Sequence, residues 1–125
     1  MKKFYKMSDS EMEIMKVIWA STAPVTVAQL LSAFESRNWK TQTVTTFLTR
    51  LTEKGLLTAY REARTNFYVP VITPKDYRQL EAQSLLSSMY DGSVQNFLAA
   101  LYSGGIDASE AEELKKWFEK AGENA

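Results

Sequence analysis

The first half of the chain contains three amphipathic segments in which large apolar residues return every three or four positions. That spacing is the one a helix needs to bury a single face. Capping boxes open the first two segments, Ser8 with Glu11 and Thr26 with Gln29. Gly55 ends the third segment, because glycine readily takes the left-handed conformation just past a last turn. We therefore predict three short helices, at about residues 8–20, 26–36 and 41–54.

An alternating pattern follows these helices. The stretches 56–62 and 67–71 are rich in aromatic and β-branched residues and flank a polar centre at 63–66, which predicts a two-stranded hairpin. An isolated hairpin is only marginally stable in water, so we expect this one to pack against the helices. The residues expected to make that contact are Leu57, Tyr60, Tyr68 and Val71. Three helices followed by a hairpin is the order of elements in a winged helix.

The predicted third helix has an unusual exposed face. Its buried stripe consists of Val44, Phe47, Leu48 and Leu51. The opposite face consists of Gln42, Thr45, Thr46 and Thr49, with Arg50 at its flank. Threonine is a mediocre helix former, because its χ1 freedom is lost against the preceding turn. A short polar face of this kind suits base edges in DNA, where hydroxyls form hydrogen bonds and threonine methyls meet the thymine methyl.

The charges are distributed unevenly, although the formal net charge is zero. Residues 1–75 contain eleven Lys or Arg and six Asp or Glu, whereas residues 76–125 contain four and nine. The first half therefore suits a polyanionic partner. Arg61 and Arg64, beside Asn66, lie at the predicted hairpin tip, where a wing would meet sugar and phosphate. A solvated hairpin tip explains these arginines equally well.

The rest of the chain has a helical pattern. One helix is expected from Pro74 to about Asp91, a second from Ser93, and a third capped by Ser109 with Glu112. These helices carry more large apolar residues than so small a unit readily buries within itself. Pairing with a second copy is one solution, and folding back onto the first half is the other. The residues expected at a dimer interface are Leu85, Met89, Val94, Phe97, Leu98, Leu101, Leu114, Trp117 and Phe118.

Composition limits the chemistry. The 125 residues, 45% hydrophobic and 24% charged, include no cysteine and no histidine, so disulfides, thiolate metal sites and histidine-dependent catalysis are excluded. We expect no metal, no cofactor and no enzymatic activity. No apolar segment of signal-peptide or membrane-spanning length follows the basic N-terminus. We therefore expect a cytoplasmic protein with no membrane partner.

The third helix and the hairpin resemble a known family. The positions that carry the resemblance are Lys40, Thr43–Val44, Thr46, Leu48, Arg50–Leu51, Lys54–Gly55, Leu57, Arg61–Glu62, Arg64 and Tyr68. With these residues the chain resembles the bacterial penicillinase-repressor family, which includes the methicillin-resistance and copper-responsive repressors. The resemblance implies a homodimeric winged-helix repressor that binds a palindromic operator of TACA and TGTA half-sites. It also implies that Thr43, Thr46 and Arg50 lie on or beside the groove, and Lys40 and Lys54 on the phosphate side.

Two departures bear on how such a repressor would be released. Copper-responsive members end in a cysteine-rich metal hook, and this chain contains no cysteine, so copper sensing by that route is excluded. Members controlled by a sensor protease are cut at an Asn–Phe bond in the dimerisation region. Asn96–Phe97 is present, about three residues earlier than the family site when counted from Gly92. Packing in an apolar helix and cleavage by a sensor protease both explain this dipeptide.

We interpret the chain as mainly α with a small β-hairpin: a winged-helix DNA-binding domain at 1–73 and a three-helix dimerisation domain at 74–125. It would repress transcription as a homodimer on double-stranded operator DNA, through a recognition helix at about 41–54 and a wing at about 57–71. The bases would be read by Gln42, Thr45, Thr46 and Thr49. The phosphates would be held by Lys40, Arg50, Lys54, Arg61 and Arg64. The alternative is a winged-helix protein-interaction module without sequence-specific DNA binding, since fold alone does not choose between them.

Overall fold

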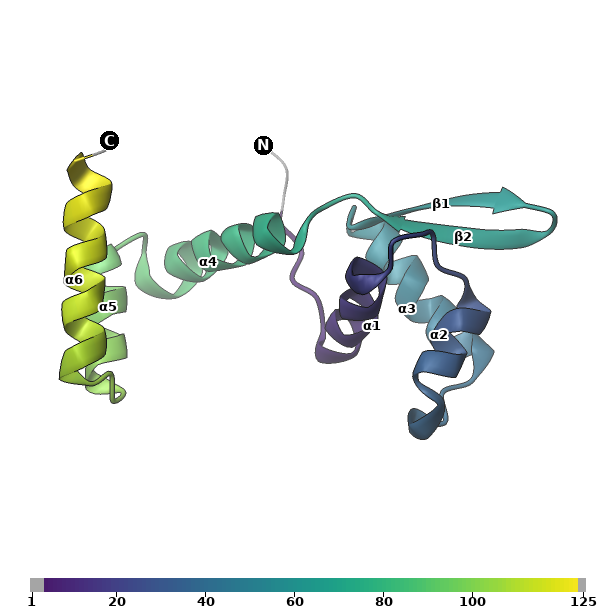
Figure 1. Cartoon of the computed structure of the whole chain (residues 1–125), viewed down its shortest axis with the longest axis horizontal. Helices are drawn as coiled ribbons and strands as arrows, with labels where there is room; N and C mark the ends of the chain where they lie inside the picture. Colours follow the sequence, from purple (N-terminus) through teal and green to yellow (C-terminus); the bar gives the residue numbers. More distant parts are fainter. Residues whose placement is uncertain (1–3, 124–125) are drawn as a thin grey trace. The chain divides into compact units, whose positions relative to one another are not determined.

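The computed structural model describes residues 4–123. It is mainly helical with one small antiparallel hairpin, and this confirms the predicted fold class (Figure 1). The chain divides into two compact units, one ending at Glu81 and the other beginning at Ala82. The elements are α1 (Asp9–Ala20), α2 (Val27–Ala33), the 3₁₀ turn η1 (Glu35–Arg37), α3 (Thr41–Glu53), β1 (Leu57–Glu62), β2 (Thr65–Pro70), α4 (Pro74–Tyr90), α5 (Val94–Ser103) and α6 (Ala108–Glu123).

The first unit holds a single apolar core. Helix α3 contributes Val44, Leu48 and Leu51, three buried residues that its sequence spacing predicts. Tyr77, in the first turn of α4, is buried in the same core. The other buried apolar residues are Met7, Ile14, Met15, Ile18, Val25, Leu30, Leu56, Leu57 and Tyr68. Helices α1 to α3 and the base of the hairpin are therefore held together by one continuous set of packed side chains.

The first two helices begin where the capping boxes predict. The Glu11 amide donates to Ser8 Oγ at 3.2 Å, and the Ser8 amide donates to the Glu11 carboxylate at 3.0 Å. Thr26 and Gln29 make the same reciprocal pair. Helix α2 ends at Ala33, earlier than the expected residue 36, because the chain tightens into η1 and then turns at Asn38 with φ 53°. Asparagine tolerates this left-handed conformation better than most residues.

The hairpin pairs Leu57 with Pro70 and Glu62 with Thr65, so its loop has only two residues. These are Ala63 and Arg64, both with positive φ (48° and 68°). Positive φ at both central residues is the signature of a type I′ turn, whose twist matches that of the flanking strands. The turn therefore places Arg64 at the tip of the wing, which extends beyond the helices of this unit (Figure 1).

The expected packing of Tyr60 and Val71 is wrong, whereas that of Leu57 and Tyr68 is confirmed. Tyr60 is 43% exposed, and its ring stacks on the cross-strand Phe67 at 5.4 Å between centroids. The reason is the pleat: residues three apart on a strand lie on opposite faces. Leu57 and Tyr60 therefore lie on opposite faces of the hairpin. Tyr68 and Val71 are also three positions apart and lie on opposite faces, with Val71 just past the end of β2.

The second unit is formed by the rest of α4 with α5 and α6. Helix α6 begins earlier than expected: Asp107 caps it by accepting from the Glu110 amide at 2.8 Å, so Ser109 is not the cap. Of the residues described from Ala82 onward, none is fully buried. Within residues 4–123, no helix is long and apolar enough to cross a membrane. A three-helix unit without a buried side chain lacks the core that usually stabilises a domain of this size.

Candidate nucleic-acid interface

The outward face of α3 forms an open hollow of about 380 Å³. The hollow is lined by Gln42, Thr45, Thr46, Thr49, Arg50 and Glu53. The three- and four-residue spacing of one helix face relates positions 42, 45, 46 and 49. The structure places all four side by side on α3, as predicted. Glu53 is a lining residue that the sequence interpretation missed, although it lies four positions after Thr49 and the same spacing would have found it. Thr43 lies beside this face and is half-buried.

The threonine hydroxyls on this face have already used their hydrogen atoms. Thr45 Oγ1 donates to the Thr41 carbonyl at 2.9 Å, Thr46 Oγ1 to the Gln42 carbonyl at 2.8 Å, and Thr49 Oγ1 to the Thr45 carbonyl at 2.9 Å. A hydroxyl has one hydrogen to donate and two lone pairs. The threonines therefore offer outside groups an acceptor and a methyl group but no donor. The donors on this face are the Gln42 amide and the Arg50 guanidinium.

Four basic side chains, from α3, its N-cap and the wing, make no hydrogen bond or ion pair among the described residues. They are Lys40, Arg50, Arg61 and Arg64, and all four are exposed. Lys40 is the N-cap residue of α3, and no side chain caps that helix. The positive end of the α3 dipole thus adds to the Lys40 charge at the same place. Cations without internal partners are available to an external polyanion.

An aromatic cluster fixes the start of α3. The Trp39 ring lies 4.9 Å from Phe34 and 5.3 Å from Phe47 between centroids. The Arg37 guanidinium lies 4.7 Å from the centre of the Trp39 ring and donates to both carboxylate oxygens of Glu13 at 2.8 and 2.9 Å. The Arg37 guanidinium is therefore engaged by contacts within the protein. These contacts hold the turn before Lys40 in place.

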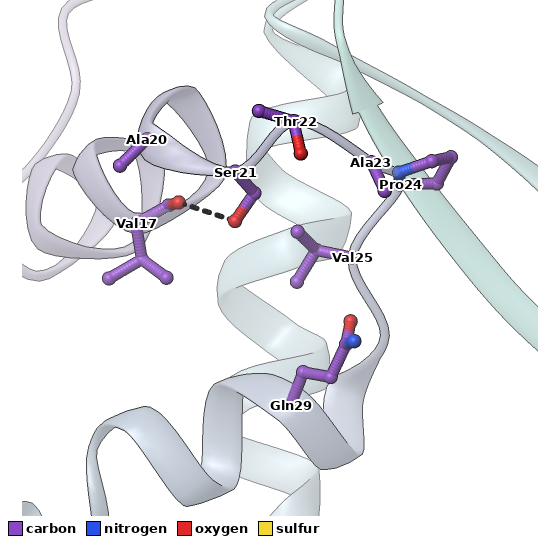
Figure 2. A pocket seen from close by; sticks show the side chains of 8 residues that line it. All are labelled: Val17, Ala20, Ser21, Thr22, Ala23, Pro24, Val25 and Gln29. Carbon is purple, nitrogen blue, oxygen red and sulfur yellow. Dashed lines mark hydrogen bonds between the residues drawn. The ribbon is translucent and has the colours of Figure 1, made fainter.

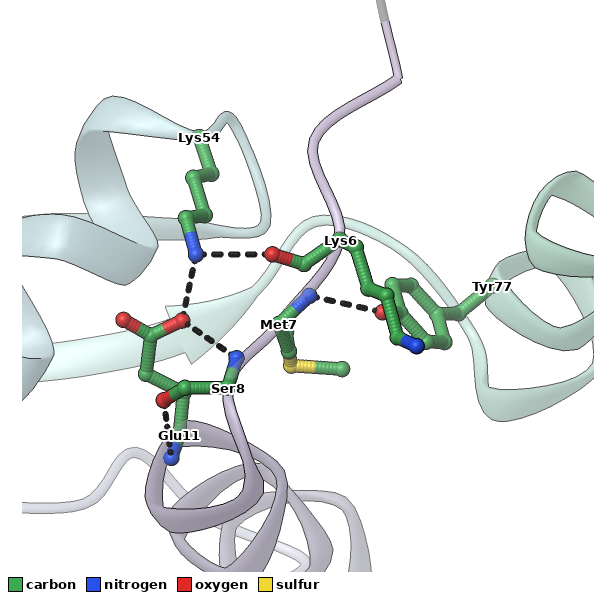
Figure 3. Close-up of polar contacts among 6 residues, drawn as sticks. All are labelled: Lys6, Met7, Ser8, Glu11, Lys54 and Tyr77. Atoms are coloured by element: carbon green, nitrogen blue, oxygen red, sulfur yellow. Dashed lines mark hydrogen bonds and ion pairs between the residues drawn. The ribbon is translucent and has the colours of Figure 1, made fainter. Parts of the chain in front are cut away.

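Lys54, expected on the phosphate side, is engaged within the first unit. Its ammonium donates to the Glu11 carboxylate at 2.5 Å and to the Lys6 carbonyl at 2.8 Å (Figure 3). The Glu11 side chain is only 2% exposed. Two of the three Lys54 donors are thus used inside the protein, which argues against the predicted phosphate contact.

Glu11 is ionised in this arrangement. Burial by itself would raise its pKa, but the hydrogen bonds from Lys54 and the Ser8 amide, with the charges of Lys54 and Arg50, together hold that pKa below its ordinary value. Nearby, burial raises the pKa of Tyr77 to about 12, and a hydrogen bond to Glu81 adds to the rise, while the Met7 amide opposes it. The Tyr77 hydroxyl therefore stays protonated and accepts from the Met7 amide at 2.8 Å.

The residues expected at a dimer interface all belong to α4, α5 or α6. Met89 is 70% exposed and Trp117 63% exposed. Four others are also exposed: Leu85, Val94, Leu101 and Phe118. The remaining three are half-buried: Phe97, Leu98 and Leu114. Large apolar side chains left this open are the usual mark of a surface that contacts another protein.

A second hollow has no charged residue in its lining. This hollow of about 450 Å³ lies at the connection between α1 and α2 and is lined by uncharged residues from Val17 to Gln29 (Figure 2). Val25, on its wall, exchanges backbone hydrogen bonds with Tyr68 at 3.0 and 2.9 Å and so attaches the hairpin to this connection. Among residues 4–123, no group of acidic, histidine or cysteine side chains could hold a metal ion.

Three helices, a basic-tipped hairpin and an exposed third-helix face define the winged-helix class. The family model described as "Penicillinase repressor" matches residues 7–120. The penicillinase repressor of Bacillus licheniformis is 32% identical over 121 residues, which cover 96% of this chain and 94% of that protein. The methicillin resistance regulatory protein MecI of Staphylococcus aureus strain N315 is 22% identical over 119 residues, which cover 94% and 97%. The chain belongs to the penicillinase repressor family.

Solved structures agree with this assignment. The DNA-binding domain of the repressor BlaI has a TM-score of 0.53 and 36% identity, and the match covers 62% of this chain and 94% of that one. The monomeric form of Bacillus licheniformis BlaI in complex with the blaP half-operator has a TM-score of 0.50, with the same identity and coverage. Membership of this family makes the chain a transcriptional repressor rather than an enzyme. The alternative of a module that only binds other proteins is not favoured.

Proposed function

We propose that the chain represses transcription by binding a palindromic operator, with half-sites like TACA and TGTA, as a homodimer through α3 and the wing. The observation that carries the proposal is the exposed polar face of α3, together with four exposed basic side chains of α3, its N-cap and the wing that make no internal hydrogen bond or ion pair. A similar protein, BlaI, has been solved in complex with a half-operator, which supports DNA as the polyanion.

Two groups of side chains divide the work of binding. Gln42, Thr45, Thr46 and Thr49 approach base edges, with Thr43 beside them. Lys40, Arg50, Arg61 and Arg64 hold phosphates, which fix the register of the protein on the duplex but carry no sequence information. Because the threonines have no donor to offer, their contribution is methyl contact with thymine and acceptance from exocyclic amino groups.

The second unit supplies the dimer in this proposal. Its lack of a fully buried side chain and its exposed apolar residues are both explained if a second copy covers them. A dimer of this kind presents two copies of α3 to successive major grooves, with half-site centres roughly 34 to 36 Å apart. We assign DNA binding to the predicted domain 1–73 and dimerisation to the predicted domain 74–125, although the two compact units divide later, between Glu81 and Ala82.

Control by a sensor protease is a separate matter. The Asn96–Phe97 bond lies inside α5, so a protease could cut it only after the helix unfolds locally. The Phe97 ring packs edge-on against Tyr90 at 5.4 Å between centroids. We therefore assign Phe97 to packing within the second unit. We do not propose cleavage of Asn96–Phe97 as the event that releases the repressor.

The direct test is selection of duplexes from a random-sequence pool by the full chain, followed by affinity measurements over a range of salt concentrations. We expect one enriched palindromic sequence and an affinity that falls steeply with salt. A chain that enriches no sequence, and that leaves a DNA column at low salt, would contradict the proposal and favour a protein partner.

Replacing Arg64 by alanine should weaken binding to selected and random duplexes by the same factor. The arginine at the wing tip meets phosphate in this proposal, and phosphates are the same in every sequence. The plot of log affinity against log salt should become less steep by about one charge. Lys16→Ala, which removes an exposed cation from α1 outside the proposed contact set, serves as the control. A lost sequence preference at an unchanged slope would instead make Arg64 a base-reading residue.

Replacing Thr46 by alanine should lower discrimination between the selected and random duplexes by roughly 1–3 kcal/mol, the scale of one base contact. Two further variants separate its parts: Thr46→Val keeps a methyl group without the hydroxyl, and Thr46→Ser keeps the hydroxyl without the methyl. Because the hydroxyl donates within the helix, we expect valine to retain more discrimination than serine. If the ratio of the affinities for the selected and the random duplex is the same in wild type and in Thr46→Ala, Thr46 does not contact a base.

A further inference from the structure

The C-terminal end of α3 is tied to two other segments of the first unit. Lys54, the C-cap residue of α3, donates to Glu11 of α1 and to the Lys6 carbonyl in the segment that precedes α1 (Figure 3). The next residue, Met7, donates its amide to Tyr77. One ammonium group thus fixes the position of the recognition helix relative to α1 and to a segment that is itself anchored.

This ion pair differs from an ordinary surface pair. Glu11 is the single charged side chain among the described residues that is fully buried, and it also accepts from the Ser8 amide. Burying an ion pair offers little net stability compared with two apolar side chains of similar size, because both charges must lose water. What the pair does provide is a specific geometry, since the ammonium and the carboxylate attract each other strongly only at short range.

The geometry matters because α3 is short and rigid. Thirteen residues form α3, so its axis is about 20 Å long at 1.5 Å per residue. A shift at the Lys54 end therefore moves the whole reading face relative to the wing. Arg50 lies one turn before Lys54, and Gln42 lies near the other end. A recognition helix held at the wrong angle keeps its charges near the duplex but loses the alignment of its side chains with base edges.

We propose that Lys54 and Glu11 are positioning residues, which set the angle of α3 so that its reading face and the wing engage the operator together. This inference rests on the proposed function, because it assigns a role within operator binding. It gives Lys54 a contribution to specificity that requires no contact with DNA.

The test compares two lysines at opposite ends of α3. Lys54→Met and its matched control Lys40→Met are made in the full chain, and each is measured against a duplex selected by the wild-type chain and a random duplex. For Lys54→Met we expect the ratio of the two affinities to fall about tenfold, the loss that one base contact produces, with the salt slope unchanged. For Lys40→Met we expect both affinities to fall alike and the slope to lose about one charge.

A double variant separates positioning from stability. Lys54→Met alone leaves a buried carboxylate without its cation and lowers the unfolding midpoint, whereas Glu11→Gln with Lys54→Met removes both charges and should recover part of that midpoint. We expect the affinity ratio of the double variant to stay low. Recovery of the ratio together with the midpoint would overturn the proposal in favour of a purely structural pair. A reduced salt slope in Lys54→Met would overturn it in favour of a phosphate contact. A wild-type chain with no sequence preference would contradict the proposed function itself.

Discussion

Replacing Leu101 by glutamate is expected to convert the proposed dimer into a monomer and to lower operator affinity by about 100-fold or more. Leu101 lies in α5 and is 42% exposed, on a stripe with Val94, Phe97 and Leu98. A carboxylate there would have to lose its water without gaining a partner when a second copy covers the stripe. Operator affinity falls because the second half-site is then bound as a separate molecule, and linkage of two binding units contributes about 10²- to 10⁴-fold.

Two measurements check this result. Gel filtration with light scattering gives the mass at micromolar concentration, and titration of a labelled operator gives the affinity. Gln95→Glu is the matched control, because it adds the same charge on the same helix one position away from the stripe. The control should stay dimeric and bind normally. A dimeric Leu101→Glu variant would show that α5 contributes little to the interface, and a monomeric wild-type chain would contradict the proposed dimer altogether.

Local periodicity predicted much of the first unit. The buried stripe of α3 and the capping boxes at Ser8 and Thr26 depend only on residues within one or two helical turns. They are confirmed, except that Phe47 of the stripe is half-buried at the edge of the core. The capping box of α6 was misplaced for an instructive reason. Asp107 with Glu110 and Ser109 with Glu112 have the same spacing, so sequence alone offers two equivalent starts, and the structure uses the first.

Features that depend on distant residues could not be predicted in the same way. Lys54 was assigned to phosphate from its match to a position of the family, but its partner Glu11 lies 43 residues earlier. Nothing in the local pattern distinguishes a lysine that faces solvent from one that reaches a buried carboxylate. The threonine face illustrates a second limit. Periodicity placed Thr45, Thr46 and Thr49 correctly on one face. Only their side-chain conformations reveal that the hydroxyl hydrogens are already bonded to carbonyls within the helix.

Replacing Leu48 by alanine should lower the free energy of unfolding by about 3 kcal/mol, within the range of 2–5 kcal/mol for buried leucines. Leu48 is 0% exposed at the centre of α3, where it is part of the core shared with α1 and the hairpin. Its truncation leaves a cavity that the surrounding helices fill only partly. Urea unfolding at constant protein concentration measures the change, and the m-value should stay close to that of the wild type.

Thr49→Ala is the matched variant on the opposite face of the same helix. Alanine is the better helix former, and the Thr49 hydroxyl bonds only within α3, so we expect stability to be unchanged or slightly higher. Discrimination between operator and random duplex should fall nonetheless, whereas folded Leu48→Ala should keep its discrimination. The two substitutions would then separate the packing face of α3 from its reading face. A large loss of stability in Thr49→Ala would mean that the threonine face packs against protein and is not open to DNA.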